Sequence, residues 1–346
     1  MSLHISSILE LINELQSGRM IILVDEEDRE NEGDLLIASE FVSSEAINFM
    51  VTHGRGLVCI TLTHEHCSKL GLSMMSDQNR SRYGTNFTQS IEAAHGIDTG
   101  ISASDRARTI RVAVSPNATP DDIVQPGHIF PLRAVTGGVL VRAGHTEAGC
   151  DLTAIAGLIP SSVICEILND DGKMARLPDL IKFSQKHNIK IGAISDLIKY
   201  RIQNETIVRR IGQFDIETIE GTFKAVFYKD LFHSKSLHIA LVSGDPRKSK
   251  ETLVHVYESI SILNIINLNE KPLNFNDVLK NIANSSSGVI VLINCESVEG
   301  NMLDQVNKIL NLEGANNANS DSINGYSCGI SDQILYELGV GVRNFI

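Results

Sequence analysis

The chain has 346 residues, which exceeds one domain of ordinary size and predicts two domains, each with its own core. Its formal net charge of −12, without a Lys- or Arg-rich cluster, argues against a nucleic-acid-binding surface. No apolar run is long enough to span a bilayer, and His4 and Glu10 interrupt the N-terminus where a secretory segment needs an apolar core. We therefore expect a cytoplasmic protein that binds neither nucleic acid nor membrane.

The first expected elements are an amphipathic helix and a short buried strand. Residues 5–16 repeat apolar side chains along one helical stripe, with Ser6 or Ser7 as a cap and Gly18 as a stop. Residues 20–24 are consecutively apolar and end in a burst of charge. Such a run predicts a strand that ends at the rim of a core, where a site can form.

The stretch DEEDRENEGD, residues 25–34, follows this strand. Its clustered carboxylates repel one another unless a cation or a shared proton offsets them, which favours a hard, oxygen-preferring ion such as Mg²⁺ or Mn²⁺. A solvated acidic turn is the structural alternative. A calcium loop starting at Asp28 fails, because its twelfth position is Ser39 and not a bidentate Glu. Arg29 offers a fork suited to phosphate or carboxylate.

Short strands then alternate with helices, which indicates an α/β or α+β domain. Strands are expected at 35–38 and 57–62, with a helix between them at 43–50. Residues 72–105 are rich in polar residues and predict a functional loop or lid, with a surface excursion as the alternative. Within this stretch, YGTNFTQSIEA predicts a turn and a strand. SASDRARTI predicts a helix with Ser104 as its N-cap.

Two further segments carry histidines. In PGHIFPLRA, residues 126–134, Pro126 and Gly127 predict a turn that exposes His128 at a strand edge. The turn Arg142 to Thr146 combines a guanidinium, a glycine and a hydroxyl, which suits a phosphate, and its His145 can bind a metal. The alternative is that His145 is an ordinary hydrogen-bonded turn residue.

Glu166 lies within the apolar run SSVICEIL, residues 161–168. A carboxylate inside an apolar strand or helix costs free energy unless it is paired or functional, so Glu166 is a candidate for acid/base chemistry. The alternative is a Glu on the exposed face of a half-buried element. Amphipathic helices at 177–187 and 195–202 are expected to close the domain.

Over about its first 200 residues the chain resembles the 3,4-dihydroxy-2-butanone-4-phosphate synthase family. The shared segments include DEEDRENEGDLLIASEF, YGTNFTQSIEA, TGISASDRARTIR, QPGHIFPLRA and VRAGHTEAGCDLTAIAGL. The resemblance implies an α/β (α+β) domain over residues 1–203 that dimerises and converts D-ribulose 5-phosphate to L-3,4-dihydroxy-2-butanone 4-phosphate and formate. It implies two Mg²⁺ or Mn²⁺ ions per site, and these roles: Glu30 and His145 as metal ligands; Arg29, Glu30, Asp34, Glu166 and the run Arg142, Ala143, Gly144, His145 and Thr146 in substrate binding; His128 and Glu166 in catalysis.

Residues 204–346 partly resemble GTP cyclohydrolase II and are expected to form a second, smaller α/β domain. That family binds catalytic zinc with three closely spaced cysteines, and the corresponding region here, PRKSKETLVHVYESISILNIINLNE, has none. We therefore expect no zinc in this domain and a cyclohydrolase-inactive fold, with a strand at 287–294 and an Asn-rich loop at 311–325. Two alternatives stay open: a bifunctional enzyme that also opens GTP, and a regulatory protein with an inactive synthase domain.

Overall fold

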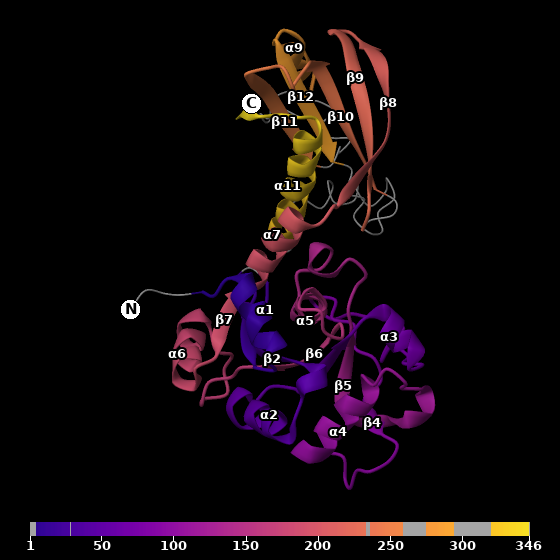
Figure 1. Ribbon diagram of the computed structural model, residues 1–346, viewed down its shortest axis with the longest axis vertical. Coiled ribbons are helices and arrows are strands. Elements are labelled where there is room, and N and C mark those ends of the chain that lie inside the picture. The colour runs from indigo at the N-terminus through magenta and orange to yellow at the C-terminus, as the bar shows by residue number, and fades with distance from the viewer. Residues whose placement is uncertain (1–4, 28, 233–235, 259–274, 294–319, 346) are drawn as a thin grey trace. The chain divides into compact units, whose positions relative to one another are not determined.

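A seven-stranded mixed sheet in the order β4-β5-β3-β6-β2-β1-β7 forms the centre of the first unit (Figure 1). The computed structural model describes residues 5–27, 29–232, 236–258, 275–293 and 320–345, and the chain divides into two units, Met1–Tyr200 and Arg201–Ile346. The strands of the first unit are β1 Ile21–Val24, β2 Gly33–Ala38, β3 Cys59–Leu62, β4 Ile91–Ala93, β5 Ile123–Arg133, β6 Ser161–Glu166 and β7 Lys190–Ala193.

Helices cover both faces of this sheet. Helices α1 and α5 contact each other; α1 packs over β7, and α5 packs over β2, β3 and β6. On the opposite side, α4 packs against β4 and β5 and contacts α2 (Figure 1). Their bounds are α1 Ile8–Gln16, α2 Ser44–Phe49, α3 His64–Lys69, α4 Ala103–Ala113, α5 His145–Ile155, α6 Leu177–His187 and α7 Ile194–Asn204. A π-helix, η2 Met50–Gly54, continues α2, and short 3-10 helices span η1 Ser39–Phe41, η3 Pro120–Asp122 and η4 Gly138–Leu140.

The first helix begins and ends as the sequence predicts. Ser7 is its N-cap and forms a capping box with Glu10, and Gly18 has the left-handed φ of 69° that favours glycine. The apolar stripe Ile8, Leu11, Ile12 and Leu15 is buried. The predicted strands at 20–24, 35–38 and 57–62 are confirmed as β1, β2 and β3.

Two local predictions are wrong. The N-cap of α4 is Ser102, whose hydroxyl accepts a hydrogen bond from the N–H of Asp105, so Ser104 lies inside the helix. Pro126 and Gly127 form no turn, because β5 continues through them. Instead, residues 125–128 bulge out of the ladder with β4, because Ile91 pairs with Ile129 and the next residue, Glu92, pairs with Val124.

The antiparallel pair β2 and β6 sets the register that matters for the site. Asp34 lies directly opposite Glu166, and Leu36 lies opposite Ile164. Directly opposed residues on neighbouring strands point to the same face of a sheet. The first carboxylate of β2 and the last carboxylate of β6 are therefore neighbours.

The second unit contains a six-stranded sheet in the order β13-β11-β12-β10-β9-β8. Its strands are β8 Val208–Thr218, β9 Gly221–Asp230, β10 Leu237–Gly244, β11 Glu251–Glu258, β12 Ser287–Ile293 and β13 Val342–Phe345, and its helices are α9 Phe275–Ala283 and α11 Ser320–Glu337. Helix α9 buries Val278, Leu279 and Ile282 against this sheet. The second α/β domain and the strand at 287–294 are confirmed.

The Asn-rich loop predicted at 311–325 is wrong over residues 320–325, which belong to α11. Its remaining residues, 311–319, lie outside the described part of the chain. Polar composition alone could not reveal that the chain enters a helix there, since packing of the later apolar residues Ile330, Ile334 and Leu335 supports the helix from its other end. Across the described residues, no helix has the length and apolar character needed to cross a membrane.

Candidate active site

Asp25 organises the acidic stretch around its own carboxylate. Oδ2 accepts hydrogen bonds from the backbone N–H of Glu30 at 3.1 Å and from Arg29 Nη1 at 2.8 Å, while Oδ1 accepts from the N–H of Glu32 at 2.8 Å. The side chain of Asp25 is 1% exposed. The stretch is therefore a closed, internally bonded loop and not a solvated acidic turn.

Arg176, which precedes α6, holds this loop from outside. Its Nη1 donates to the backbone carbonyl oxygen of Glu30 at 2.9 Å and to that of Asn31. Asn31 has a φ of 52°, in the left-handed region that Asn tolerates better than most residues. These bonds orient the backbone on both sides of the Glu30 side chain.

The loop brings several carboxylates against His145, the first residue of α5. Ligand atoms of Asp25, Glu30 and His145 lie within 4.8 Å of one another, and those of Glu32, Asp34 and His145 do likewise. His145 is buried, with Nε2 3.2 Å from the carbonyl oxygen of Leu23. The predicted pair Glu30 and His145 is thus brought together, although 115 positions separate them in the chain.

Two observations indicate that the carboxylates and His145 could bind a divalent cation. Asp34 Oδ1 is buried and is one of the few buried polar atoms of the described residues without a hydrogen-bond partner. Burial lowers the pKa of His145, which favours the neutral imidazole that metals bind. Carboxylate oxygens plus one neutral imidazole suit Mg²⁺ or Mn²⁺.

Burial and mutual repulsion also raise the pKa values of the carboxyl groups here. Burial, followed by the charge of Glu30, raises the pKa of Glu32 to about 8. Burial, followed by the charge of Glu166, raises the pKa of Asp34 well above its usual value. Burial likewise raises the pKa of Glu166. Without a cation, these groups hold protons at a pH at which ordinary carboxyls have lost them.

Glu166 is held by the segment that follows the π-helix. Its Oε2 accepts a hydrogen bond from the backbone N–H of Leu57 at 2.7 Å. A Cβ on the adjacent Gly56 would lie 2.3 Å from the same oxygen, so only glycine allows this close approach. Glu166 therefore has a fixed position at the end of β6, as its charge within an apolar run suggested.

The turn Arg142 to Thr146 forms the N-terminus of α5. Its N-cap is Gly144, which has no side chain to accept the N–H groups of the first helical turn. Free N–H groups and the helix dipole at this end attract anions. The turn predicted to bind phosphate thus lies beside the acidic loop, because its His145 is close to the carboxylates of that loop.

Arg142 is itself held by several groups of the protein. Nη1 lies 2.5 Å from Oε2 of Glu147, whose other oxygen accepts the N–H of Val135 at 3.0 Å. Nε and Nη2 donate to the carbonyl oxygen of Tyr83, and Nη2 also donates to the hydroxyl of Thr85 at 3.0 Å. The guanidinium therefore has few N–H groups left for a ligand.

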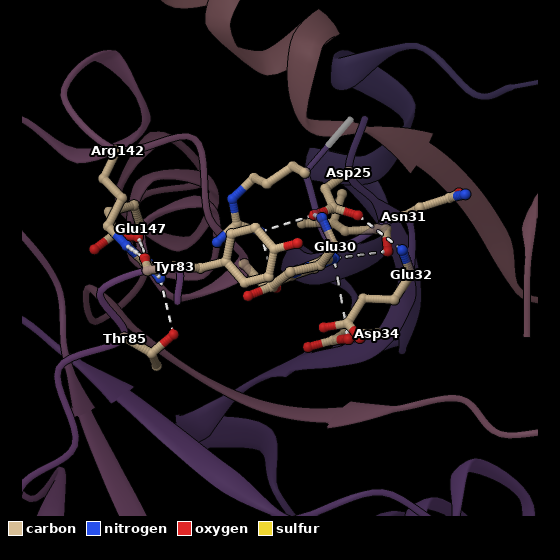
Figure 2. A network of polar contacts seen from close by, with 12 residues as sticks. Asp25, Glu30, Asn31, Glu32, Asp34, Tyr83, Thr85, Arg142 and Glu147 are labelled. Carbon is tan, nitrogen blue, oxygen red and sulfur yellow. Dashed lines mark hydrogen bonds and ion pairs between the residues drawn. The ribbon is translucent and has the colours of Figure 1, made fainter. Parts of the chain in front are cut away.

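Tyr83, from the polar segment 72–105, lies between the two parts of the site (Figure 2). Its carbonyl oxygen accepts from Arg142, and its ring lies 5.6 Å from the guanidinium carbon of Arg29. Arg29 is itself bonded to Asp25 and Glu30. The predicted loop or lid thus contacts both the acidic loop and the α5 turn.

His128 lies elsewhere on the sheet. Strands β3 and β6 separate β5, which carries His128, from β2, which carries Asp34. Three strand spacings of ~4.8 Å put these backbones roughly 14 Å apart. Among the described residues, His128 is paired with Glu92, with Nδ1 2.6 Å from Oε1.

Several residues of this arrangement were not singled out from the sequence. Asp25 and Glu32 lay within the acidic stretch, but nothing in it distinguished them from their neighbours. Glu92 had no local signal, since its partner His128 lies on a different strand, and Glu147 directly follows the turn Arg142 to Thr146 but was not singled out with it. Tyr83 had a weak signal as the aromatic residue of a long polar segment.

Comparison with known proteins is decisive for the family. The sequence model of 3,4-dihydroxy-2-butanone 4-phosphate synthase matches residues 9–200, more than half of the chain. The chain belongs to this synthase family. A synthase of that name from Neisseria meningitidis serogroup B is 51% identical over 338 residues, covering 97% of this chain and 91% of the relative.

A second sequence model, that of GTP cyclohydrolase II, matches residues 209–344. A riboflavin biosynthesis protein RibBA from Aquifex aeolicus is 44% identical, covering 97% of this chain and 85% of that protein. Like these relatives, this synthase-family chain acts in riboflavin biosynthesis. It is a lyase that converts D-ribulose 5-phosphate to L-3,4-dihydroxy-2-butanone 4-phosphate and formate.

Solved structures support the same two-domain architecture. RibBX, a two-domain synthase from A. baumannii, has a TM-score of 0.84 and 43% identity, covering 99% of this chain and 93% of that one. A synthase in complex with two magnesium ions has a TM-score of 0.55 and 39% identity, covering 57% of this chain and 97% of that one. The synthase family therefore includes members that correspond to the first unit alone.

Proposed function

We propose that the synthase reaction takes place where the acidic loop meets the N-terminus of α5. The observation that carries this proposal is the approach of Glu30 and His145, whose ligand atoms lie within 4.8 Å of each other and of Asp25. Both residues match the metal ligands that the family resemblance implies. The raised pKa values of Asp34 and Glu166 beside them support proton-transfer chemistry at the same place.

Glu30 and His145 would bind the divalent cation, and Asp25, Glu32 and Asp34 would supply further oxygens. The two overlapping sets of ligands share His145, whose neutral imidazole can bind only one ion, so the second of two Mg²⁺ or Mn²⁺ ions per site would be held by carboxylates. When bound, such an ion acts as a Lewis acid on neighbouring substrate oxygens. The protein groups below bind the substrate and transfer its protons.

Substrate binding falls to the two sides of the site. The N–H groups of His145 and Thr146, with Arg142, Ala143 and Gly144, would bind the phosphate, because that end of α5 has no side-chain cap. On the other side, Arg29, Glu30 and Asp34 would contact the hydroxyl and carbonyl oxygens of the sugar.

Glu166 and His128 would carry the proton transfers. Enolisation, dehydration and rearrangement of a ketose phosphate require groups that both give and take protons. The raised pKa of Glu166 suits a carboxyl that donates a proton and recovers it. His128 would take part in proton transfer from β5. Its distance from the acidic loop within one chain means that the substrate must extend to it, or that a second chain must supply it.

A homodimer would bring a second copy of His128 to the site. The separation of β5 from β2 by two strands supports this proposal, since no described contact joins His128 to the acidic loop within one chain. Light scattering should give twice the chain mass. Inactive His128→Asn and Glu30→Gln proteins should regain activity on mixing if their sites combine residues of two chains.

The alternatives differ in measurable ways. A bifunctional enzyme, favoured by the cyclohydrolase match over 209–344, would contain zinc and release formate from GTP. We expect neither, because the cysteine-rich zinc segment is missing from the sequence. A regulatory protein would need substitutions at the motif residues, and Arg29, Glu30, Asp34, His128, His145 and Glu166 are all present.

Location in the cytoplasm stays a prediction.

The test is formate release from D-ribulose 5-phosphate with and without EDTA. Glu30→Gln and His145→Ala should each lower kcat/KM by about 100-fold or more, since loss even of groups that only orient a ligand costs ~10–100-fold. Glu65→Gln, which changes an exposed carboxylate on α3, is the matched control and should stay fully active. Activity that survives both chelation and these substitutions would overturn the proposal.

A further inference from the structure

Glu92 and His128 form a carboxylate–imidazole pair at the β4–β5 edge of the sheet. The distance from Nδ1 to Oε1 is 2.6 Å, and the Glu92 side chain is 13% exposed while that of His128 is 44% exposed. An ionised carboxylate can only accept, so Nδ1 of the neutral imidazole carries the hydrogen. Nε2 is then left with its lone pair free to act as a base.

The surrounding contacts fix the position of this pair. The N–H of Gly127 donates to the hydroxyl of Ser90 at 3.1 Å, just before His128 on β5. The N–H of Ala93 donates to the hydroxyl of Thr109 on α4 at 3.0 Å, just after Glu92 on β4. These two side-chain hydrogen bonds therefore fix the backbone just before His128 and just after Glu92, where the ladder between β4 and β5 is irregular.

The loop before α4 closes over the Glu92 carboxylate. A Cβ on Gly100 would lie 1.4 Å from Glu92 Oε1, the oxygen bonded to His128, and Gly100 has a φ of 84°. The N–H of Gly100 donates to Asp105 Oδ2 at 3.0 Å, which ties the loop to the first turn of α4. Glu92 thus occupies a space that exists only because residue 100 has no side chain.

An exposed His–Glu pair by itself contributes little to the free energy of unfolding and often has no functional role. This pair differs because its acidic member is largely buried, two side-chain hydrogen bonds hold its strands, and a glycine makes room for its carboxylate. These features fix the orientation of an imidazole without contributing to the core. Such an arrangement is expected where the direction of a histidine matters.

We propose that Glu92 is a positioning residue for His128, which it holds as the Nδ1–H tautomer with Nε2 directed outward as the proton acceptor. This inference rests on the proposed function, since His128 is the group that the reaction would use. Glu92 acts through His128 and contacts no substrate.

The experiment compares Glu92→Gln, Gly100→Ala and the control Asp121→Asn, which changes an exposed carboxylate in η3, just before β5. A carboxylate can only accept, whereas an amide of the same shape can also donate N–H to Nδ1, so the variant no longer imposes the Nδ1–H tautomer. Both test variants should lower kcat by about 10-fold or more with KM within about twofold, because orientation and not binding is lost. The melting temperature of Glu92→Gln should stay close to that of the unchanged protein.

The second readout is the tautomer of His128, followed by ¹⁵N NMR of histidine-labelled protein and assigned with His128→Asn. The unchanged protein should show the Nδ1–H signature, and Glu92→Gln should lose it. An unchanged tautomer in Glu92→Gln, or full kcat in both test variants, overturns the inference. If the unchanged protein releases no formate, the proposed function fails, while the NMR comparison still decides whether Glu92 sets the tautomer. If Gly100→Ala does not fold, Glu92→Gln decides alone.

Discussion

At the level of single residues, the site combines acidic groups that would repel one another if all were ionised. Asp34 and Glu166 are opposed across β2 and β6, and Glu32 lies beside Glu30. The fold places few cations among them: Arg29 is bonded to Asp25 and Glu30. The metal-free protein must therefore keep protons on part of this cluster.

This arrangement predicts how stability depends on pH. A carboxyl whose folded pKa is raised stabilises the fold fully below its unfolded pKa, and that stabilisation is lost as the pH rises through the folded pKa. For Glu32 the range extends from 4.5 to about 8. In EDTA the melting temperature should thus fall across this range, and Glu32→Gln should reduce the slope.

Magnesium should remove most of the dependence of the melting temperature on pH, because the cation replaces the protons on the carboxyl groups. The increase in melting temperature that magnesium causes should therefore grow with pH. Differential scanning fluorimetry at several pH values measures both effects. Glu26→Gln, which removes an exposed carboxylate of the same loop, is the control and should keep the slope. A metal-free melting temperature that rises from about pH 5 to about pH 8 would contradict the raised pKa values.

At the level of elements, the acidic loop depends on a contact from α6. Arg176 donates to the carbonyl oxygens of Glu30 and Asn31, and it is exposed. Arg176→Ala should weaken Mg²⁺ binding by about 10-fold, because the loop loses the bonds that orient Glu30. The melting temperature should change little. Isothermal titration with Mg²⁺ measures the affinity, with Lys186→Ala on the same helix as the control; equal affinities in both variants would show that the loop holds its shape unaided.

The elements also show what the sequence could predict. The sequence predicted strand β1 from a run of apolar residues, the cap of α1 from a serine before an apolar stripe, and the position of Glu166 from a charge within an apolar run. Each of these signals is local. Ser102 and Ser104 both fit the cap of α4, and only backbone geometry decides between them. The prediction of a turn in β5 failed because Pro126 can remain in a strand where its own residues bulge out of the ladder.

Nonlocal partners were beyond such reasoning. The resemblance paired Glu30 with His145 across the chain, but it gave no indication of Asp25 as the centre of the loop. Glu92 and Arg176 act on residues 36 and 146 positions away, through contacts that only the fold creates. Their roles follow from distances and not from any spacing in the sequence.

At the level of the whole molecule, the synthase activity should reside in the first unit. The chain divides at Tyr200, the synthase match ends at residue 200, and a solved synthase with two magnesium ions corresponds to 57% of this chain. We therefore propose that residues 1–203 fold alone and release formate at a rate within about threefold of the full chain, since a domain carries its own core. A folded but inactive fragment would show that the second unit contributes to the reaction.

The contacts of Arg142 have a consequence for ligand entry. Its guanidinium already donates to Tyr83, Thr85 and Glu147, so a phosphate that takes the N–H groups directed at Tyr83 displaces the peptide oxygen of that residue. A phosphate bound through these N–H groups would therefore release the contact between Arg142 and the segment that carries Tyr83. Substrate binding would then replace a contact within the protein by a contact with the phosphate. The segment around Tyr83 would be free to adopt a different arrangement over the bound sugar.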